Sequence, residues 1–425
     1  MQGKSSIAFI GSYPPRACGI ATFTRDLSEA VAGCDHHLQP WVAAITDEGA
    51  LYQYPRHVRW SIDQQDLASW REAARAINES PVSVVCLQHE FGIFGHFGRD
   101  GRFFDHLPPF LEELRKPVVS TLHTVLPSPR PDHSEAIRYL HDRSDAVVTM
   151  VNMARLILEE EYGLDAKKLH TIPHGVPHVP QVPPEMAKQC LHLNGRTVLS
   201  TFGLVNSGKG IQYVIRALPD VVKEHPDVLY LVIGETHPEI RRREGEKYRN
   251  SLIELTKRLK LEKHVRFVNQ YLTQDQLISY LQATDIYITP YVNRNQITSG
   301  TLAYALGAGK AVISTPYLYA AEALAEGRGL LAEFGNPKSF ARCVRLLLEQ
   351  PALRAHCEQS ALAYGRPMSW ETVGTRYVDL FCQVTGTRQR RAADIAAGSE
   401  LQPMYTDKVG AKEQEPVDLA VAAPH

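Results

Sequence analysis

A lysine flanked by glycines follows an apolar run near the middle of the chain. The run TVLSTFG (197–203) is typical of a buried strand, and NSGKG (206–210) separates it from a helical pattern. Lys209 would supply a compact positive charge, and the backbone N–H groups of the turn a fixed cradle for an anion. Gly210 stands where a P-loop carries the serine or threonine that holds magnesium, so this turn is not a P-loop. The alternative is a surface lysine after an ordinary turn.

Two other turns have the same strand-to-helix setting. Gly19, in GSYPPRACGIATFTRDL (11–27), opens a helical pattern, and its missing side chain would let a ligand approach the backbone closely. The segment TSGT (298–301) combines hydroxyls and a glycine at an expected helix start. Free N–H groups at a helix N-terminus suit an anionic ligand, so both turns are candidate anion sites. A plain turn and a capped helix are the respective alternatives.

Histidines give a fourth group of candidates. Among the 18 histidines, His89 and His123 each follow an apolar, strand-like run, and Glu90 stands beside the first. A histidine at a strand end in a cleft can donate to a substrate oxygen or shuttle a proton. We interpret His174, near a proline-rich segment, as structural. The sequence has no H-E-x-x-H spacing, and its seven cysteines form no C-x-x-C pair, so we expect no metal.

The elements that must position these residues form two successive blocks. In each block short apolar runs alternate with amphipathic helical stretches, which predicts α/β domains with parallel sheets covered on both faces. A proline-dense span (172–186) separates the blocks, and the polar, alanine-rich tail from 386 to 425 is predicted to be disordered. Ligands of open α/β sheets bind outside the carboxyl ends of the strands, where the candidates fall.

Composition limits the partners. With 46 Lys+Arg against 47 Asp+Glu, the formal net charge of −1 gives no global attraction to nucleic acid or anionic membranes. The apolar runs are too short for a secretory signal or a bilayer-spanning helix, so we expect a cytoplasmic protein with no integral membrane segment. A homo-oligomer is compatible with the sequence.

Taken together, residues 5–384 resemble the retaining glycosyltransferases of the GT-B fold, family 4 or group 1. The motifs that carry the resemblance are, in chain order, PPRACGIATF, STLHTV, IPHGV, FGLVNSGKGIQYVIRAL, LVIGETHPE, VNQYLTQDQLISYLQATDIYITPY, GTLAYALGAGKAVIST and SWETV.

The resemblance implies two Rossmann-like domains that face each other across a cleft. An acceptor-side domain would cover residues 1–185 and a donor-side domain residues 195–368, with a last helix (369–384) crossing back to the first domain. The expected reaction moves a hexose from a UDP- or GDP-linked sugar to a hydroxyl of a sugar or small-molecule acceptor, with retained configuration and without a metal or cofactor.

The resemblance also assigns roles to residues. By position, Lys209 matches the lysine that binds the donor diphosphate, and His123 the histidine near the reacting sugar. In the expected front-face transfer, Lys209 stabilises the leaving phosphate and Gln296 helps to orient the sugar. The donor-binding residues are expected to be Gly19, Asn206, Ser207, Lys209, Glu235, Thr298, Ser299, Gly300, Thr301 and Tyr304, and the acceptor-binding residues Arg16, His89 and Glu90.

Two departures from the family pattern bear on the donor. Leu204 stands where a second basic residue is usual, so one phosphate contact is missing or comes from elsewhere, with Arg294 a candidate on position alone. Aligning Lys310 with the lysine of the family's strand places Gln296 and Tyr304 where two glutamates are usual. Tyr304 cannot accept from both hydroxyls of a ribose as a carboxylate does.

Three functions therefore stay open from the sequence. The first is a glycosyltransferase with an altered ribose contact. The second is a phosphorylase that uses inorganic phosphate and releases a sugar-1-phosphate, which needs no ribose contact. The third is a non-catalytic sugar- or nucleotide-binding protein on the same scaffold, against which the presence of Lys209, Gly19 and His123 counts.

Overall fold

Two parallel sheets organise the chain in a computed structural model that describes residues 5–35 and 38–386. The first sheet has the order β3-β2-β1-β4-β7-β8-β9, in which every pairing is parallel. A short antiparallel hairpin, β5-β6, follows β4. The strands are β1 (Ser5–Gly11), β2 (Leu38–Thr46), β3 (Val58–Asp63), β4 (Val82–His89), β5 (Gly95–Phe97), β6 (Phe103–Asp105), β7 (Val118–Leu122), β8 (Ala146–Thr149) and β9 (Leu169–Thr171).

The second sheet repeats this plan with the order β12-β11-β10-β13-β14-β15, also parallel throughout. Strands β11, β13 and β14 are buried along their whole length, as expected when helices cover both faces of a sheet. The strands are β10 (Thr197–Phe202), β11 (Val228–Ile233), β12 (Val265–Val268), β13 (Ile286–Thr289), β14 (Ala311–Ser314) and β15 (Leu330–Leu331).

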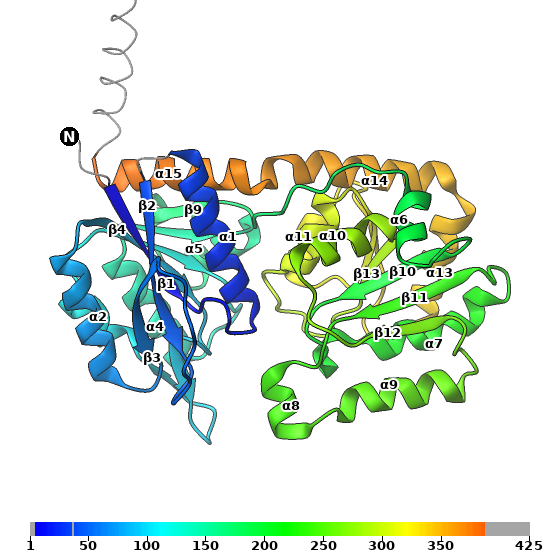
Figure 1. Ribbon diagram of the computed structural model, residues 1–425, viewed down its shortest axis with the longest axis horizontal. Helices are drawn as coiled ribbons and strands as arrows, with labels where there is room; N and C mark the ends of the chain where they lie inside the picture. The colour runs from blue at the N-terminus through cyan, green and yellow to red at the C-terminus, as the bar shows by residue number, and fades with distance from the viewer. Residues whose placement is uncertain (1–4, 36–37, 387–425) are drawn as a thin grey trace, which may run out of the picture. The chain divides into compact units, whose positions relative to one another are not determined.

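Helices connect successive strands in both halves (Figure 1). Those of the first half are α1 (Gly19–Cys34), α2 (Leu67–Glu79), α3 (Leu107–Glu113), α4 (Pro131–Arg143) and α5 (Asn152–Glu160). Those that follow are α6 (Pro184–Cys190), α7 (Ile211–Val222), α8 (Pro238–Glu244), α9 (Lys247–Arg258), α10 (Gln274–Ala283), α11 (Gly300–Gly307), α12 (Leu318–Ala323), α13 (Pro337–Glu349), α14 (Pro351–Gly365) and α15 (Trp370–Val384).

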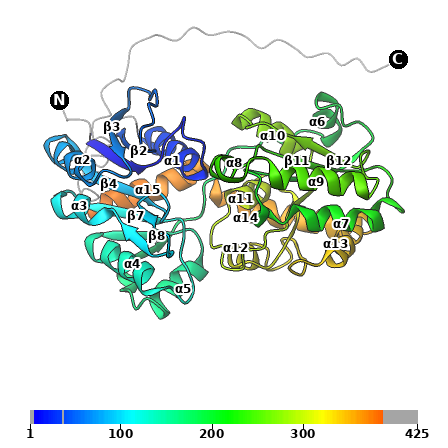
Figure 2. The same ribbon diagram turned by 90° about the horizontal axis from the view of Figure 1, so that it is seen from below.

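The last helix packs on the first sheet. Figures 1 and 2 show α15 among the first-half elements, whereas α14, just before it in the chain, lies with the second half. The Tyr377 hydroxyl is 2.9 Å from Oγ1 of Thr121 in β7, and the ring of Phe381 packs edge-on against Phe9 of β1. The backbone of Gly374 lies so close to α1 that a Cβ there would sit 2.9 Å from the backbone of Ala30. The architecture is the predicted α/β, GT-B arrangement of two Rossmann-like sheets.

Both sheets belong to one compact unit that ends at Thr385, so the predicted division near residues 185–195 stays a prediction. The predicted disordered tail (386–425) lies, apart from Gly386, outside the described residues. No helix in the described ranges is long and apolar enough to cross a membrane.

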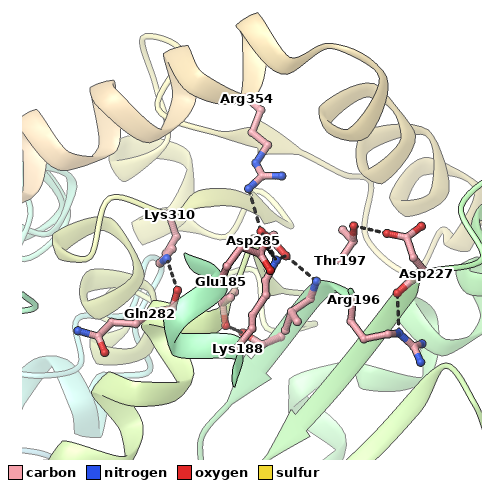
Figure 3. Close-up of polar contacts among 12 residues, drawn as sticks. Glu185, Lys188, Arg196, Thr197, Asp227, Gln282, Asp285, Lys310 and Arg354 are labelled. Carbon is pink, nitrogen blue, oxygen red and sulfur yellow. Dashed lines mark hydrogen bonds and ion pairs between the residues drawn. The ribbon is translucent and has the colours of Figure 1, made fainter. Parts of the chain in front are cut away.

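A buried ion-pair cluster holds the second half together (Figure 3). Asp285, just before β13, is 6% exposed and accepts a hydrogen bond from the backbone N–H of Val198 at 2.7 Å. Its carboxylate also receives Lys188 of α6 at 2.9 Å and Arg354 of α14 at 3.1 Å. A carboxylate paired with two cations joins α6, β10, β13 and α14 at one point.

Candidate functional site

A cavity of about 850 Å³ lies at the carboxyl ends of the strands of both sheets. Its walls come from the loops and helix starts that follow β1, β4 and β7 in the first half, and β10, β11, β12 and β13 in the second. This is where open parallel sheets bind ligands, because the loops that leave the strands converge there. Most of the residues singled out in the sequence lie in this cavity.

The structure separates the predicted site residues into two groups. One group lines the cavity: Gly19, Glu90, His123, Asn206, Lys209, Glu235, Gln296, Thr298, Gly300, Thr301 and Tyr304. The other group does not line it: Arg16, His89, Ser207 and Ser299. Arg25, Phe23 and His174 also line it, although the sequence did not single them out as site residues.

The turn that carries Lys209 is fixed by its neighbours. Gly210 has a φ of 63°, and a Cβ on it would lie 2.0 Å from the carbonyl oxygen of Pro290, so only glycine fits there. Nζ of Lys209 lies 3.9 Å from the ring centroid of Tyr291, a cation–π contact that steadies the ammonium. Among the described residues no carboxylate forms an ion pair with Lys209, so its charge is uncompensated within the cavity.

His123 is a neutral acceptor in this geometry. Its Nε2–H donates to Oε1 of Gln88 at 3.0 Å, and its ring stands edge-on to Phe23 of α1 with centroids 4.7 Å apart. Burial, with His174 and His89 nearby, lowers the pKa of His123 to about 3. The ring therefore stays neutral with Nδ1 as the remaining acceptor. Donation, expected from the sequence, is disfavoured because Gln88 already takes the N–H. Proton shuttling is disfavoured because the lowered pKa makes Nδ1 a weak base.

His174 lines the cavity and, like His123, is a neutral ring with one nitrogen left as an acceptor. Its Nδ1–H donates to the carbonyl of Gly175 at 2.6 Å, which leaves the lone pair on Nε2. Nε2 would lie 2.8 Å from a Cβ on Gly300, at the start of α11, and the ring stands edge-on to Phe23. Burial lowers the pKa of His174 to about 4. The sequence signal was available, because His174 follows β9 as His123 follows β7.

The 296–304 segment mixes capping with cavity-lining groups. Ser299 is a helix cap: its Oγ accepts from the N–H of Leu302 at 3.3 Å, as the alternative interpretation of this turn proposed. Gln296 donates its amide N–H to the carbonyl of Thr298 at 3.0 Å, which leaves Oε1 as an acceptor in the cavity. Tyr304 donates to Oδ2 of Asp26 in α1 at 3.3 Å.

Of the three predicted acceptor-binding residues, Arg16, His89 and Glu90, only Glu90 lines the cavity. Its carboxylate accepts from Oγ1 of Thr124 at 2.7 Å, and burial raises the pKa of Glu90. Arg16 is engaged elsewhere, in an ion pair with Asp47 at 2.7 Å. His89 points into the apolar core, where neither ring nitrogen has a hydrogen-bond partner in the described structure.

Arg294, suggested for the second phosphate contact, does not lie in the wall of the cavity. Its guanidinium stacks on the ring of Phe334 at 4.2 Å. Arg25 does line the cavity, from α1. Sequence position could not rank these two arginines, because Arg25 reaches the cavity from the other half of the chain.

Two family models match the chain. Residues 185–363 match the model described as Glycosyl transferases group 1, and residues 17–179 match the model described as Glycosyltransferase Family 4. The two matches lie side by side and together span most of the chain, including every cavity wall described above.

Similar proteins agree with these matches. Phosphatidyl-myo-inositol mannosyltransferase of Mycolicibacterium smegmatis is 25% identical over 280 residues, which are 65% of this chain and 67% of that protein. D-inositol 3-phosphate glycosyltransferase of Corynebacterium efficiens is 27% identical over 190 residues, 44% of this chain and 43% of that protein. The chain thus spans less than half of the second relative.

Solved structures show the same fold. Alr3699/HepE of Anabaena, in complex with UDP and glucose, matches with a TM-score of 0.68 at 15% identity, over 89% of this chain and 100% of that chain. At this identity the likeness concerns the fold alone, and the fold is that of the GT-B glycosyltransferases.

Proposed function

The chain belongs to the group 1 and family 4 glycosyltransferases, and from this premise we propose that it transfers a hexose from a nucleotide-sugar to a hydroxyl acceptor with retained configuration. The observation that carries the proposal is the uncompensated charge of Lys209 in a cavity that also holds the start of α11. Such a site suits a ligand with a phosphate group. The HepE structure, which contains UDP and glucose, supports a UDP-linked donor, and a GDP-linked donor is the other candidate.

The chemistry follows from these groups. The bond between the anomeric carbon and the diphosphate oxygen breaks, and its electron pair leaves with the phosphate. Lys209 and the N–H groups at the start of α11 stabilise that charge as it develops. The acceptor hydroxyl attacks on the same face, and its proton passes to the departing phosphate oxygen. In this scheme no protein group takes the proton, which fits the low pKa of about 3 of His123, since a nitrogen with that pKa is a weak base.

Two acceptor atoms can orient the donor sugar. Nδ1 of His123 and Oε1 of Gln296 both belong to residues that line the cavity, and each has its donor group already used by the protein. Sugar hydroxyls are donors, so these atoms are suited to hold them. Glu90 faces the cavity from the first half of the chain and is the candidate to receive the acceptor hydroxyl.

The test is turnover with a panel of UDP- and GDP-sugars and simple sugar acceptors, followed by NMR of the product. We expect an α-linked donor to give an α-linked product. A β-linked product would refute the retaining scheme, and a protein that neither turns over nor binds any of these donors would refute the proposed function.

One observation favours a phosphorylase as the second candidate. Tyr304 stands where the family pattern has a glutamate, so this face of α11 has no carboxylate to hold a ribose. Its hydroxyl donates to Asp26 instead. A phosphorylase needs no ribose contact. Thermal shift separates the two, because a ligand that binds the native state raises its stability: inorganic phosphate alone would stabilise a phosphorylase, and a nucleoside diphosphate a transferase.

A further inference from the structure

One wall of the cavity is built around an arginine that a buried carboxylate holds in place. Both Nε and Nη2 of Arg25 donate to Oδ1 of Asp26, at 2.8 and 2.5 Å. Oδ2 of the same carboxylate accepts from the hydroxyl of Tyr304. Asp26 is 6% exposed and does not line the cavity, whereas the side chain of Arg25 is 32% exposed and does. The Asp26 carboxylate thus lies beneath the cavity wall and holds Arg25 in position, and the Arg25 guanidinium faces the cavity.

Both halves of the chain contribute to this wall. Arg25 and Asp26 are in α1, Tyr304 is in α11, and Nη2 of Arg25 also donates to Oε1 of Gln274 at the start of α10, at 3.4 Å. Burial and the neighbouring Asp26 raise the pKa of Tyr304, so its hydroxyl keeps its proton and remains the donor. The arrangement fixes the direction of each hydrogen bond: Arg25 and Tyr304 donate, and Asp26 accepts.

Towards the ligand space this wall therefore presents the guanidinium of Arg25 and no carboxylate, because Asp26 does not line the cavity. Among the described residues, the acidic side chains that line the cavity are Glu90, on the first sheet's side, and Glu235, which is paired with Arg241 at 3.2 Å. A vicinal diol is held well by a carboxylate that accepts from both hydroxyls, whereas a guanidinium has no acceptor atom. Phosphate and carbonyl oxygens are the ligand atoms that a guanidinium binds best.

We propose that Arg25, positioned by Asp26 and Tyr304, recognises the nucleotide leaving group of the donor by donating to the phosphate or carbonyl oxygens of that nucleotide. The site then does not distinguish donors by their ribose hydroxyls. The proposal rests on the proposed function, since it concerns the nucleotide part of the same donor. Arg25 is then a specificity residue, and Asp26 and Tyr304 are positioning residues. A sugar donor whose nucleotide lacks the ribose 2′-hydroxyl should be bound about as well as the normal donor.

Calorimetric titration of the full chain tests this with UDP, GDP and ADP, each beside its 2′-deoxy counterpart. We expect the best-bound nucleotide and its 2′-deoxy form to have dissociation constants within about threefold. Arg25→Gln should weaken both by about tenfold or more, because a charge-assisted contact is lost. Tyr304→Phe should weaken the binding of the nucleotide and of its 2′-deoxy form by the same, smaller factor. Arg258→Gln, on the exposed side of α9, is the matched control and should bind as the unchanged protein does.

Two results would overturn the inference while the proposed function survives. One is a loss of tenfold or more when the 2′-hydroxyl is removed, and the other is unchanged binding by a folded Arg25→Gln protein. If Arg25→Gln does not fold, the 2′-deoxy comparison on the unchanged protein decides alone. If none of the three nucleotides binds, the proposed function fails and the inference fails with it, which is a distinct outcome.

Discussion

Glu322 caps a helix that belongs to the other half of the chain. Its Oε1 accepts from the backbone N–H of Asn152 at 3.0 Å, and its Oε2 from the N–H of Met153 at 2.8 Å. These are the first two residues of α5, whose own N-cap, Val151, provides no capping side chain. A carboxylate at a helix N-terminus also interacts favourably with the helix dipole. Helix α5 thus depends on α12 for a cap that its own sequence lacks.

Removal of this carboxylate should weaken the contact between α5 and α12. We expect Glu322→Ala to lower the free energy of unfolding by about 1 kcal/mol, the usual cost of a lost helix cap. Urea unfolding measures this, with Glu135→Ala, at an exposed position of α4, as the control. If the contact also helps to close the cavity, the donor KM should rise as well. Equal stability of the two variants would contradict the capping role.

Lys209 is expected to be essential for turnover and dispensable for folding. Loss of a group that stabilises developing charge costs about 10²- to 10³-fold in kcat, so the kcat of Lys209→Ala should be lower than that of the unchanged protein by this factor. Its melting temperature should stay near that of the unchanged protein, because the ammonium has a cation–π contact and no ion pair with a described residue. Lys223→Ala, at the exposed end of α7, is the control. A folded Lys209→Ala protein with full activity would remove the basis of the proposed function.

Gly210 should tolerate no side chain. In Gly210→Ala the new Cβ would meet the carbonyl of Pro290 at 2.0 Å in addition to the cost of a positive φ. We expect a loss of about 3 kcal/mol or more in unfolding free energy, together with reduced activity, since the turn carries Lys209. Gly163→Ala separates the cost of the contact with Pro290 from the cost of a positive φ, because Gly163 has a φ of +68° and open space around it. That control should lose only about 1 kcal/mol. Equal losses in thermal or urea unfolding would show that Pro290 does not restrict this turn.

The sequence predicted the fold well because the fold depends on periodic patterns. Apolar runs that alternate with amphipathic stretches specify parallel strands and covering helices, whatever the individual contacts are. The same reasoning placed Lys209, Gly19 and His123 at strand ends, and the structure brings all three to one cavity.

Side-chain direction was not predictable in the same way. Successive side chains at the end of β4 have different surroundings: Gln88 bonds to His123, His89 enters the apolar core beside Phe94, and Glu90 reaches the cavity. Side chains alternate between the two faces of a strand, but the sequence does not say which face meets the ligand. Arg25 was missed for another reason, because its place in the cavity depends on Tyr304, nearly 280 positions away.

The buried histidines predict a stability that falls in acid. Burial lowers the pKa of His89 and His123 to about 3 and that of His174 to about 4, from an ordinary value of 6.5. Below pH 6.5 the unfolded chain therefore binds protons that the folded chain does not. Stability should be unaffected by these groups above pH 7 and should fall between pH 6.5 and 4, by up to about 4 kcal/mol per pH unit for three groups.

His89→Leu measures the contribution of one of these histidines to the loss of stability in acid. The variant should reduce the acid slope by about 1.4 kcal/mol per pH unit, and should unfold at the same or a higher temperature at pH 8, since the two unpartnered nitrogens are removed. Melting temperature and urea unfolding from pH 4 to 8 measure both effects. A slope in His89→Leu equal to that of the unchanged protein would mean that His89 is protonated in the folded state.

Asp285 should matter for stability and little for the chemistry. Its carboxylate compensates Lys188, which is 5% exposed, and Arg354. Asp285→Asn leaves these two cations without a full counter-charge in a buried place, which should cost about 3–5 kcal/mol of unfolding free energy. The residue does not line the cavity, so the folded fraction should keep its kcat. Asp142→Asn, whose side chain is 78% exposed, is the control and should change stability by less than about 0.5 kcal/mol. A drop in kcat at constant folded fraction would show instead that the ion-pair cluster controls the position of the cavity walls.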